Sequence, residues 1–432
     1  MFRCALLDVV PLRRDNWIMS STSPFLAAAE RHRKAVVSLL GDLVHTPSLS
    51  TNEEDVVNRL RQEMLDGGFD EVFIEPFGSV VGRIGNGPVN IVYDSHVDTV
   101  AVGSRGEWQT DPFEPTIRPD AGGGVMWGRG SSDDKGGIAS MVRGAALYNE
   151  LGRSESVTLW VVGSVQEEEC DGLALEHVLT EVIPKPDLVV LGEATRCQVY
   201  RGNRGRIEVL VQLKGSSCHA SAPDRGINPV YHLAPVIAEV EALNSNLGKD
   251  DFLGSGSVAL TKIECETPSL NAVPSTATIY LDRRLTAGES PEEALEEIRQ
   301  LPAVKAAGGN VQLLTYERTS FTGMTLSQPK SFSTWVTPAD HYGVKAGLEA
   351  GRVALDKELA TGSWVFSTNG VASMGKLAIP TIGFGPGDEV HAHTAHDQCA
   401  LDDLVTAMAW YAAFPAVFAE HYRQVNLAGR NL

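Results

Sequence analysis

Three adjacent carboxylates, Glu167, Glu168 and Glu169, follow the apolar run 157–165 (VTLWVVGSV) with only Gln166 between them. That run has the composition of a buried strand, so carboxylates drawn toward a core at its end would each need a partner or a proton. A solvated strand end is one interpretation of this acidic cluster. A bound cation is the other.

Further imidazole and carboxylate side chains occupy comparable places along the chain. They follow apolar runs or precede a helix: His96 and Asp98 after residues 89–95, Asp133 and Asp134 before a helix expected to begin near Lys135, Glu193 after residues 187–192, and His391, His393 and His396 after residues 380–385. Each alone has an ordinary explanation, as a core or surface histidine, a helix-capping acid or a polar loop. Occurring together, they favour a shared function.

The elements that would position these residues are parallel strands. The runs 89–95, 157–165, 187–192 and 380–385 are continuously apolar, which is typical of strands covered by helices on both faces. The predicted fold class is therefore α/β, with a doubly wound, mostly parallel sheet. Because ligands bind beyond the carboxyl ends of such strands, we expect the candidate residues to meet at one edge of the sheet.

The stretch between the third and fourth of these runs has a different pattern, in which apolar and polar residues alternate. Alternating strands at 205–215, 257–265, 275–285 and 310–317, with helical patterns after the first and third, have the order β-α-β-β-α-β of a ferredoxin-like unit. We therefore expect an α+β domain inserted into the main one. The predicted divisions are an N-terminal extension, the first part of the main domain, the inserted domain and the second part of the main domain: residues 1–22, 23–200, 201–318 and 319–432.

Capping residues mark two helix starts. Thr51 and Glu54 have the spacing of a capping box ahead of a helical pattern, and Ser290 and Glu293 have the same spacing with Pro291 at the first helical position. These pairs predict a helix after Thr51 and another after Ser290.

Composition and charge restrict the class of protein. Hydrophobic residues make up 43% and charged residues 21% of the 432 residues, as in a globular chain of more than one domain. The formal charge of -19 disfavours nucleic acid and anionic membrane surfaces as partners and favours small molecules and cations. No apolar run approaches the length of a membrane span.

The cysteines and the N-terminal residues indicate the cellular compartment of the protein. Six cysteines are scattered singly without a C-x-x-C pair, which argues against a structural zinc site and a disulfide framework and favours a reducing cytoplasm. In residues 1–22, Arg13 and Arg14 follow the apolar stretch, which Pro11 interrupts, and this charge order is the reverse of a signal peptide. We expect a loosely ordered extension there, with Met1 and Met19 both as candidate starts.

The candidate residues suit a catalytic metal site. Mixed imidazole and carboxylate ligands are typical of zinc, and also of cobalt or manganese, and the absence of cysteine argues against a purely structural site. Two cations sharing one carboxylate and one water would each need further ligands from this set. The shared water would act as a hydroxide nucleophile, and a spare carboxylate would accept its proton. This hypothesis requires an unligated glutamate beside a ligand, which the acidic cluster offers.

Several motifs in order give the chain a family resemblance. They are SHVDTV, GRGSSDDKGG, EEE after a strand, GEAT, SSCHASAPDRGINP, NAVPSTATIYLDRR and GPGDEVHAHTAHD, spread from about residue 25 to the C-terminus. Together they resemble the ArgE/DapE family of dinuclear zinc peptidases and deacylases, which includes carboxypeptidase G, acetylornithine deacetylase, succinyl-diaminopimelate desuccinylase and aminoacylase. The segments VQEEECDG and WVFSTNGVASMG look most like its selenium-metabolism-linked hydrolase branch.

The resemblance implies a role for each candidate residue of the main domain. Two divalent cations per subunit, zinc or else cobalt or manganese, would be held by five ligands: Asp133 as the bridge, His96 and Glu193 at one ion, and Glu168 and His393 at the other. Glu167 would be the general base that later protonates the leaving amine. Asp98 would orient the imidazole of His96 and fix its tautomer. Asp134 would be only a helix-start acid, and Glu169 a bystander.

The inserted domain would serve as a lid and dimerisation domain and contribute substrate contacts. His219 matches the histidine of this family that polarises the scissile carbonyl, commonly across a dimer interface, so the resemblance implies a homodimer. Asn271 and Arg284 match its substrate-binding asparagine and arginine, and a guanidinium is well shaped to hold a carboxylate. A salt bridge on the strand surface is the alternative for Arg284.

Two positions depart from the family pattern. Gln166 stands where an acid usually precedes the glutamate pair, and His396-Asp397 stands where asparagine-glutamate usually ends the last motif. The first concerns positioning beside the base. The second leaves His391, His393 and His396 as competing ligands, and we choose His393 because it has the family spacing from GPG.

The expected function is metal-dependent hydrolysis of an amide bond in a small N-acyl amino acid or short peptide. Hydrolysis of a carbamoyl or ureido acid on the same scaffold is an alternative that the metal-site pattern does not separate. A non-catalytic metal-binding homologue is a third, which the loss of a ligand or of the base would favour. Neither is lost.

Overall fold

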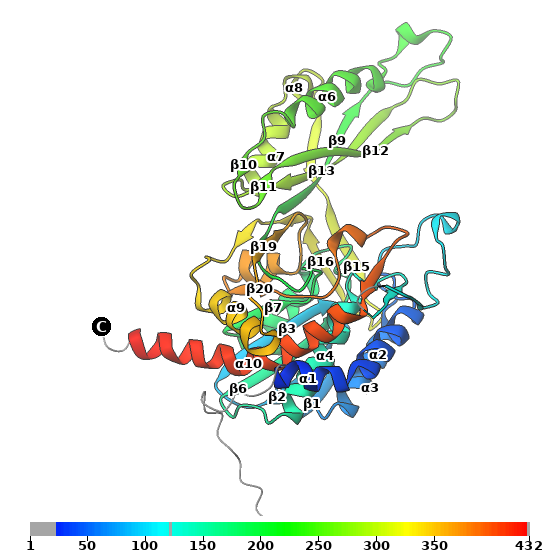
Figure 1. Cartoon of the computed structure of the whole chain (residues 1–432). Helices are drawn as coiled ribbons and strands as arrows, with labels where there is room; N and C mark the ends of the chain where they lie inside the picture. The colour runs from blue at the N-terminus through cyan, green and yellow to red at the C-terminus, as the bar shows by residue number, and fades with distance from the viewer. Residues whose placement is uncertain (1–22, 121–122, 430–432) are drawn as a thin grey trace, which may run out of the picture.

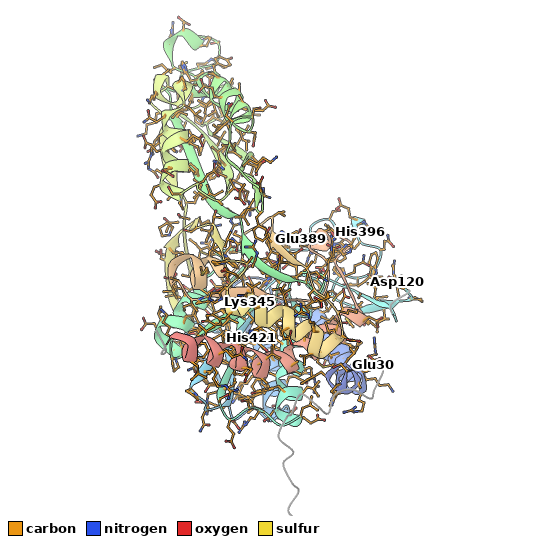
Figure 2. All side chains as sticks on the ribbon, turned by 60° about the vertical axis from the view of Figure 1, so that its left-hand side comes forward. Glu30, Asp120, Lys345, Glu389, His396 and His421 are labelled. Atoms are coloured by element: carbon orange, nitrogen blue, oxygen red, sulfur yellow. The ribbon has the colours of Figure 1, made fainter. Side chains whose placement is uncertain are left out.

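The computed structural model describes residues 23–120 and 123–429. A large lobe contains both ends of the described chain, and a smaller lobe stands out from it, running from β9 (Gly205–Lys214) to β14 (Asn310–Leu313) (Figure 1, Figure 2). The predicted extension 1–22, with Met1 and Met19, lies outside the described residues.

The large lobe is built around one mixed sheet. Within the described residues, nine strands form it in the order β1-β2-β6-β3-β7-β20-β8-β18, with β19 beside β8. These strands are β1 (Glu71–Ile74), β2 (Val80–Gly85), β3 (Val89–His96), β6 (Val157–Ser164), β7 (Leu188–Leu191), β8 (Val199–Asn203), β18 (Trp335–Val336), β19 (Thr361–Trp364) and β20 (Thr381–Gly383). The four apolar runs identified in the sequence are β3, β6, β7 and β20, and they form its parallel centre.

The α/β class is confirmed, although parallel pairing is more restricted than expected. At one edge β1 pairs antiparallel with β2, and β2 with β6. At the other edge β8 pairs antiparallel with both β20 and β18. Only residues 75–79 join β1 to β2, which is too short a link for the crossover that parallel neighbours need, so these two strands form a hairpin.

The helices begin largely where the sequence indicates. In the described ranges they are α1 (Pro24–Arg31), α2 (Arg33–His45), α3 (Glu54–Asp66), α4 (Lys135–Glu150), α5 (Leu173–His177), α6 (Pro229–Leu243), α7 (Pro291–Gln300), α8 (Pro302–Ala306), α9 (Tyr342–Leu355) and α10 (Leu401–Gly429). The capping box of Ser290 and Glu293 is confirmed at α7. The box of Thr51 and Glu54 is wrong, because Glu53 is the N-cap of α3 and accepts the N–H of Thr51 at 2.8 Å. Among these helices, none is long and apolar enough to cross a membrane.

Both faces of the sheet centre are covered. Tyr93 in β3 donates its hydroxyl to the carbonyl of Tyr411 in α10 at 2.8 Å. The next residue, Asp94, accepts a hydrogen bond from Asn369 at 2.8 Å. Because successive side chains of a strand point to opposite faces, α10 and the segment around Asn369 lie on opposite sides of the sheet. α4 and α9 pack against α10 and extend its layer.

The inserted domain has its own sheet and core. β12 (Ser257–Glu266), β13 (Thr276–Leu285), β9 and β14 form an antiparallel sheet in that order, with α6 and α7 as the crossover helices of a ferredoxin-like unit. Alternate residues of β9 are buried, as the alternation in the sequence predicts. These residues pack with α6 and α7 in a cluster separate from the core of the large lobe. The exact domain boundaries stay predictions.

Short strands and turns complete the described chain. They are β4 (Thr116–Arg118), β5 (Val125–Trp127), β10 (Lys249–Asp250), β11 (Gly254–Ser255), β15 (Thr315–Thr319), β16 (Thr325–Pro329), β17 (Ser331–Phe332), β21 (Gln398–Ala400), and the 3-10 or π turns η2 (Arg105–Glu107), η3 (Val178–Val182), η4 (Pro223–Arg225), η5 (Val371–Lys376) and η6 (Glu389–His391). β21 pairs with β5, so the loop before β21 lies beside the loop that follows β5. This pairing joins two segments that carry candidate residues.

Candidate metal centre

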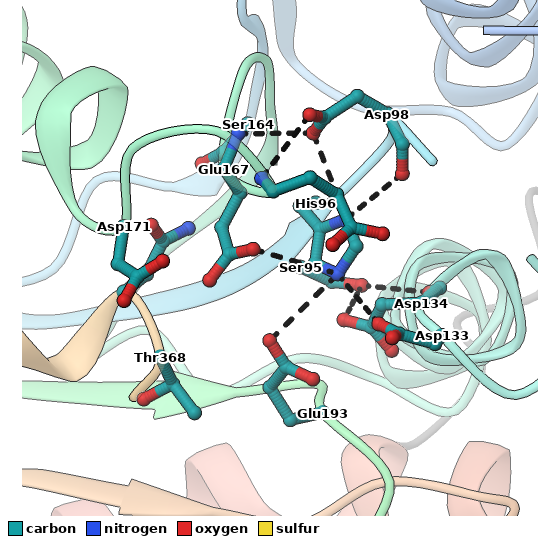
Figure 3. A network of polar contacts seen from close by, with 12 residues as sticks. Ser95, His96, Asp98, Asp133, Asp134, Ser164, Glu167, Asp171, Glu193 and Thr368 are labelled. Carbon is teal, nitrogen blue, oxygen red and sulfur yellow. Dashed lines mark hydrogen bonds and ion pairs between the residues drawn. The ribbon is translucent and has the colours of Figure 1, made fainter. Parts of the chain in front are cut away.

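Three neighbouring parallel strands end at one edge of the main sheet, and each delivers candidate residues. β3 ends at His96, Glu167 and Glu168 follow β6, and Glu193 follows β7. Since β6, β3 and β7 are adjacent and parallel, these side chains converge beyond the carboxyl ends of the strands, as Figure 3 shows for His96, Glu167 and Glu193.

Asp133 faces two histidines with its two carboxylate oxygens. Its Oδ1 lies 2.9 Å from Nε2 of His96, and its Oδ2 lies 3.3 Å from Nε2 of His393. Nε2 of His393 also lies 2.8 Å from Oε2 of Glu168. The peptide bond between Asp133 and Asp134 is cis. A carboxylate with one oxygen toward each histidine has the arrangement of a bridging ligand.

His96 lies at the centre of the cluster and is almost fully buried. Its Nδ1 donates to the backbone carbonyl of Asp98 at 3.0 Å, which leaves Nε2 free to act as an acceptor or ligand. Besides Asp133, Nε2 lies 3.9 Å from Oε2 of Glu167 and 3.8 Å from Oε1 of Glu193. One imidazole nitrogen therefore faces three carboxylates.

The electrostatics of the cluster indicate an excess of buried negative charge. Burial, followed by the charge of Asp134, raises the pKa of Glu193 well above its ordinary range. Burial also raises the pKa of Glu167, although the nearby His96 opposes that shift. Hydrogen bonds to Asp133 and then to Glu168 raise the pKa of His393 to about 10. A cation among these groups would neutralise the carboxylates and replace the proton on the imidazole.

The donor set fits divalent cations. Ligand atoms of His96, Asp133 and Glu168 lie within 4.8 Å of one another, as do those of His96, Asp134 and Glu193. Imidazole nitrogens with several carboxylates and no thiolate are the ligands that zinc, cobalt and manganese accept in catalytic sites. The two groups overlap at His96, and Asp133 and Glu168 of the first group also lie within 3.3 Å of Nε2 of His393.

Asp134 is a member of the cluster that sequence reasoning set aside as a helix-start acid. It is the N-cap residue of α4, but its side chain makes no capping hydrogen bond there. Its Oδ2 instead accepts from the hydroxyl of Ser95 at 2.6 Å, and the residue is fully buried. Its adjacency to Asp133 was the available signal, and the capping explanation concealed it.

The carboxylate of Asp98 holds the backbone of the acidic cluster. Its Oδ1 accepts the N–H of Glu167 at 3.0 Å, and its Oδ2 accepts the N–H of Glu168 at 3.2 Å and the hydroxyl of Ser50 at 2.7 Å. Nδ1 of His96 lies 3.6 Å from Oδ1 of Asp98 but only 3.0 Å from the backbone carbonyl oxygen of Asp98. The carbonyl of Asp98 is therefore the closer partner of the imidazole, and its carboxylate mainly positions two glutamates.

The loop between β20 and β21 also carries His391, His396 and Asp397, and these residues have other partners. His391 lies 3.2 Å from the side chain of Gln398, and exposed His396 lies edge-on to Trp127. Buried Asp397 accepts the N–H groups of Gly130 at 2.6 Å and Ser132 at 2.9 Å. Asp397 thus fixes the loop that carries Asp133, and of the three histidines it is His393 that faces the carboxylates.

The predicted substrate residues of the inserted domain do not join this cluster within the described chain. His219 is exposed, and its Nδ1 accepts the N–H of Ser221 at 3.1 Å. Exposed Asn271 lies in the neighbouring loop, where its backbone carbonyl accepts the N–H of Ala220 at 2.8 Å. Arg284 pairs with Asp282 at 2.7 Å, which is the strand-surface salt bridge considered as its alternative.

A cavity of about 510 Å³ opens beside His393. Ala101, Glu107, Arg129 and His396 are among the residues that line it. Its volume is in the range of small-molecule sites, and it places free space next to the carboxylate cluster.

Comparison with known proteins gives matches along the chain. The model of the peptidase dimerisation domain M20_dimer matches residues 201–310. The uncharacterized protein YgeY of Escherichia coli (strain K12) is 42% identical over 400 residues, covering 92% of this chain and 98% of that protein. The succinyl-diaminopimelate desuccinylase of Zymomonas mobilis is 27% identical over 323 residues, covering 70% of this chain and 83% of that enzyme. Among solved structures, the M20 family metallo-carboxypeptidase Sso-CP2 from Sulfolobus solfataricus has a TM-score of 0.70 at 19% identity, covering 89% of this chain and 99% of that one.

Proposed function

Because this chain belongs to the ArgE/DapE-type family of M20 metallopeptidases and deacylases, we propose that it cleaves an amide bond in a small N-acyl amino acid or short peptide. The family makes it a hydrolase of amide bonds. The observation that carries the finer proposal is the arrangement around Asp133, which faces His96 and His393 with separate oxygens while Glu167 lies beside the ligand set.

Two divalent cations, zinc or else cobalt or manganese, are the cofactors that this donor set favours. Asp133 would bridge them, with His96 and Glu193 at one and Glu168 and His393 at the other. Bound there, the cations would polarise the substrate carbonyl and lower the pKa of the attacking water.

Glu167 is the residue that would move the proton. Its carboxylate is buried at the cluster and its backbone is fixed by Asp98. Burial raises the pKa of this carboxyl group, so its ionised form is a stronger base that can take a proton from the attacking water and then give it to the leaving amine. Glu168 is its neighbour in a turn that follows β6, not on the extended backbone expected from the sequence, because the N–H of Cys170 donates to the backbone carbonyl of Glu167 at 2.9 Å.

The substrate contacts of the inserted domain would be made across a homodimer. Exposed His219 and Asn271 lie together on that domain, and the segment that contains them matches a peptidase dimerisation domain. In the proposal, His219 of one subunit stabilises the developing oxyanion in the site of the other. Arg284 would exchange Asp282 for a substrate carboxylate.

We also propose a cytoplasmic location. Cys170, Cys197 and Cys399 are free and buried, which suits a reducing compartment. The relation to selenium-metabolism-linked hydrolases stays a prediction from the segments that carry it.

An assay of purified protein loaded with zinc, cobalt or manganese tests this function. The substrates are a panel of N-acyl amino acids, dipeptides and ureido acids, and release of the amine is measured. We expect hydrolysis of an N-acyl amino acid or a dipeptide, its loss with a chelator, and its return with metal. Turnover of ureido acids alone would favour the carbamoyl alternative, and a loaded protein inactive on the whole panel would contradict the proposal.

A further inference from the structure

Two connections join the inserted domain to the large lobe. The outward connection passes from β8 to β9 at Arg204, and the return connection passes from β14 to β15 at Leu314. Both lie close to the loop that carries Glu167, which we call the base loop and define as residues 166–171.

The outward connection contacts the end of the base loop. Arg206, the second residue of β9, places Nη2 2.9 Å from Oδ1 of Asp171. The two side chains are 13% and 5% exposed, so this ion pair is largely shielded from water. Asp171 also accepts a hydrogen bond from the hydroxyl of Ser367, and the guanidinium lies over the ring of Phe332 at 4.8 Å.

The return connection contacts the start of the base loop. Tyr316 in β15 donates its hydroxyl to Oε1 of Gln166 at 2.7 Å, and both side chains are buried. Gln166 has a φ of 56°, the left-handed conformation that side-chain-bearing residues seldom adopt. Its N–H donates to Oε1 of Glu53 at 3.2 Å, which helps hold the turn. The change of direction between β6 and the two glutamates depends on this residue.

Glu167 lies between these two contacts. Its own backbone is tied to the large lobe through Asp98, and Gly172, just after the loop, donates its N–H to Asn369 at 2.7 Å. The base loop is therefore attached to the large lobe at its middle and just beyond its end, while its first and last residues contact the connections to the inserted domain.

We propose that Asp171, Arg206, Gln166 and Tyr316 are positioning residues that transmit the orientation of the inserted domain to Glu167. This inference rests on the proposed function, in which Glu167 is the general base. Arg206 lies in the first strand of the inserted domain and moves with it, whereas Tyr316, two residues after the return connection, is buried in the core of the large lobe. In the proposal, a movement of the inserted domain displaces the end of the base loop through Arg206 and pulls on its start through the return connection at Tyr316. The carboxylate of Glu167 is then aligned in one orientation of the inserted domain and misaligned in others.

The test uses three variants and two matched controls. Tyr316→Phe removes only the hydroxyl that Gln166 accepts, Asp171→Asn removes the charge that faces Arg206, and Arg206→Gln removes the other half of that pair. Tyr280→Phe is the control for the hydroxyl, since Tyr280 donates to Glu264 within the inserted domain. Arg299→Gln is the control for the charge, since half-exposed Arg299 pairs with Glu296 on one helix.

Steady-state kinetics on a substrate from the panel supply the first readout. We expect each of the three variants to lower kcat about 10- to 100-fold with KM changed less than about threefold, because misalignment affects the chemical step. Metal content per subunit and melting temperature should stay near those of the controls for Tyr316→Phe. Asp171→Asn combined with Arg206→Gln should be no slower than the slower single variant, because both remove one contact.

Hydrogen exchange of the peptide spanning residues 166–172 supplies a readout that needs no substrate. In the metal-loaded protein we expect exchange at least about 10-fold faster in the three variants than in wild type, with no change in either control. If wild type hydrolyses nothing in the panel, the proposed function fails, and this measurement alone decides whether the contacts hold the loop.

Three results would overturn the inference. One is a kcat within about twofold of wild type together with unchanged exchange in Tyr316→Phe and Asp171→Asn. Another is a rise in KM at constant kcat, which would make these residues substrate contacts. The third is a loss of metal that parallels the loss of rate, which would assign the contacts to the metal site.

Discussion

Oδ1 of Asp98 accepts a hydrogen bond from the backbone N–H of Glu167 at 3.0 Å. The second oxygen of the same carboxylate accepts the N–H of Glu168 at 3.2 Å. One side chain thus fixes the backbone of both the proposed base and a proposed ligand, while its carbonyl holds the ring of His96. The carboxylate and the backbone carbonyl of Asp98 therefore fix the positions of Glu167, Glu168 and His96 relative to one another.

Asp98→Asn is expected to lower both activity and metal affinity. The amide presents an N–H₂ group to one of the two N–H donors, so one glutamate backbone loses its acceptor. We expect a loss of about 10- to 100-fold in metal affinity, measured by competition with a chelator, and a comparable or larger loss in kcat. Asp66→Asn, at the exposed end of α3, is the control. Unchanged affinity and rate would show that the carboxylate is dispensable.

Glu167→Gln is expected to abolish turnover and keep the metal. The amide has almost the shape of the carboxylate but cannot accept a proton from water, and a general base typically contributes about 100- to 10,000-fold to a rate. Kinetics and elemental analysis of the same preparation check the two parts. A rate within about fivefold of wild type would exclude Glu167 as the base, and a loss of metal would make it a ligand.

Asp133→Ala and His393→Ala are expected to differ in how much metal they lose. Asp133 faces both histidines, so its removal should cost both cations, whereas half-exposed His393 lies against Asp133 and Glu168 at one proposed ion, so its removal should cost one. Elemental analysis after dialysis gives the metal content per subunit. Equal losses in the two variants would contradict the bridging role of Asp133.

The parts of the site that sequence predicts are those set by strand ends. Parallel neighbouring strands end at the same edge of the sheet, so the convergence of His96, Glu167 and Glu193 follows from their positions at the end of β3 and after β6 and β7. The start of α4 at Lys135 and the capping box of Ser290 are likewise local patterns, and both are observed.

The parts that sequence does not predict depend on contacts between distant segments. Glu53, not Thr51, is the N-cap residue of α3, and its carboxylate accepts the N–H of Gln166, a contact that no local spacing signals. The contacts of Tyr316 with Gln166 and of Arg206 with Asp171 join segments far apart in the chain. Such pairs follow from the packing of segments that are distant in the chain, and residue types alone do not predict which residues meet.

Complementation between variants tests whether His219 acts across a dimer. His219→Ala should lower turnover without loss of metal, because His219 is exposed and lies in the inserted domain. Coexpression of His219→Ala with Glu167→Gln should then restore about one quarter of wild-type activity, since half of randomly assorted dimers are mixed and each of these has one complete site. Size-exclusion chromatography checks that dimers form. No restoration would place His219 in the site of its own subunit or outside any site.

Glu53 is expected to make stability depend on pH. Burial, followed by the charge of Asp98, raises its pKa to about 8, while the N–H groups of Thr51 and Gln166 oppose the shift. The folded state therefore binds a proton that the unfolded chain releases near its ordinary pKa of about 4.5. Because the folded pKa is raised, this contribution to the free energy of unfolding is full below that ordinary value and is lost as pH rises through about 8.

Glu53→Gln isolates this effect, because the amide oxygen still accepts the same two N–H groups and carries no charge. Denaturant unfolding between pH 5.5 and 9 should show wild type losing on the order of 1–3 kcal/mol relative to the variant across that range. Effects of pH on metal binding are common to both proteins and cancel in the difference. Glu54→Gln, which changes the exposed neighbouring residue, should run parallel to wild type. If Glu53→Gln also ran parallel to wild type, Glu53 would be ionised in the folded protein throughout, and its burial would have to be balanced by a cation.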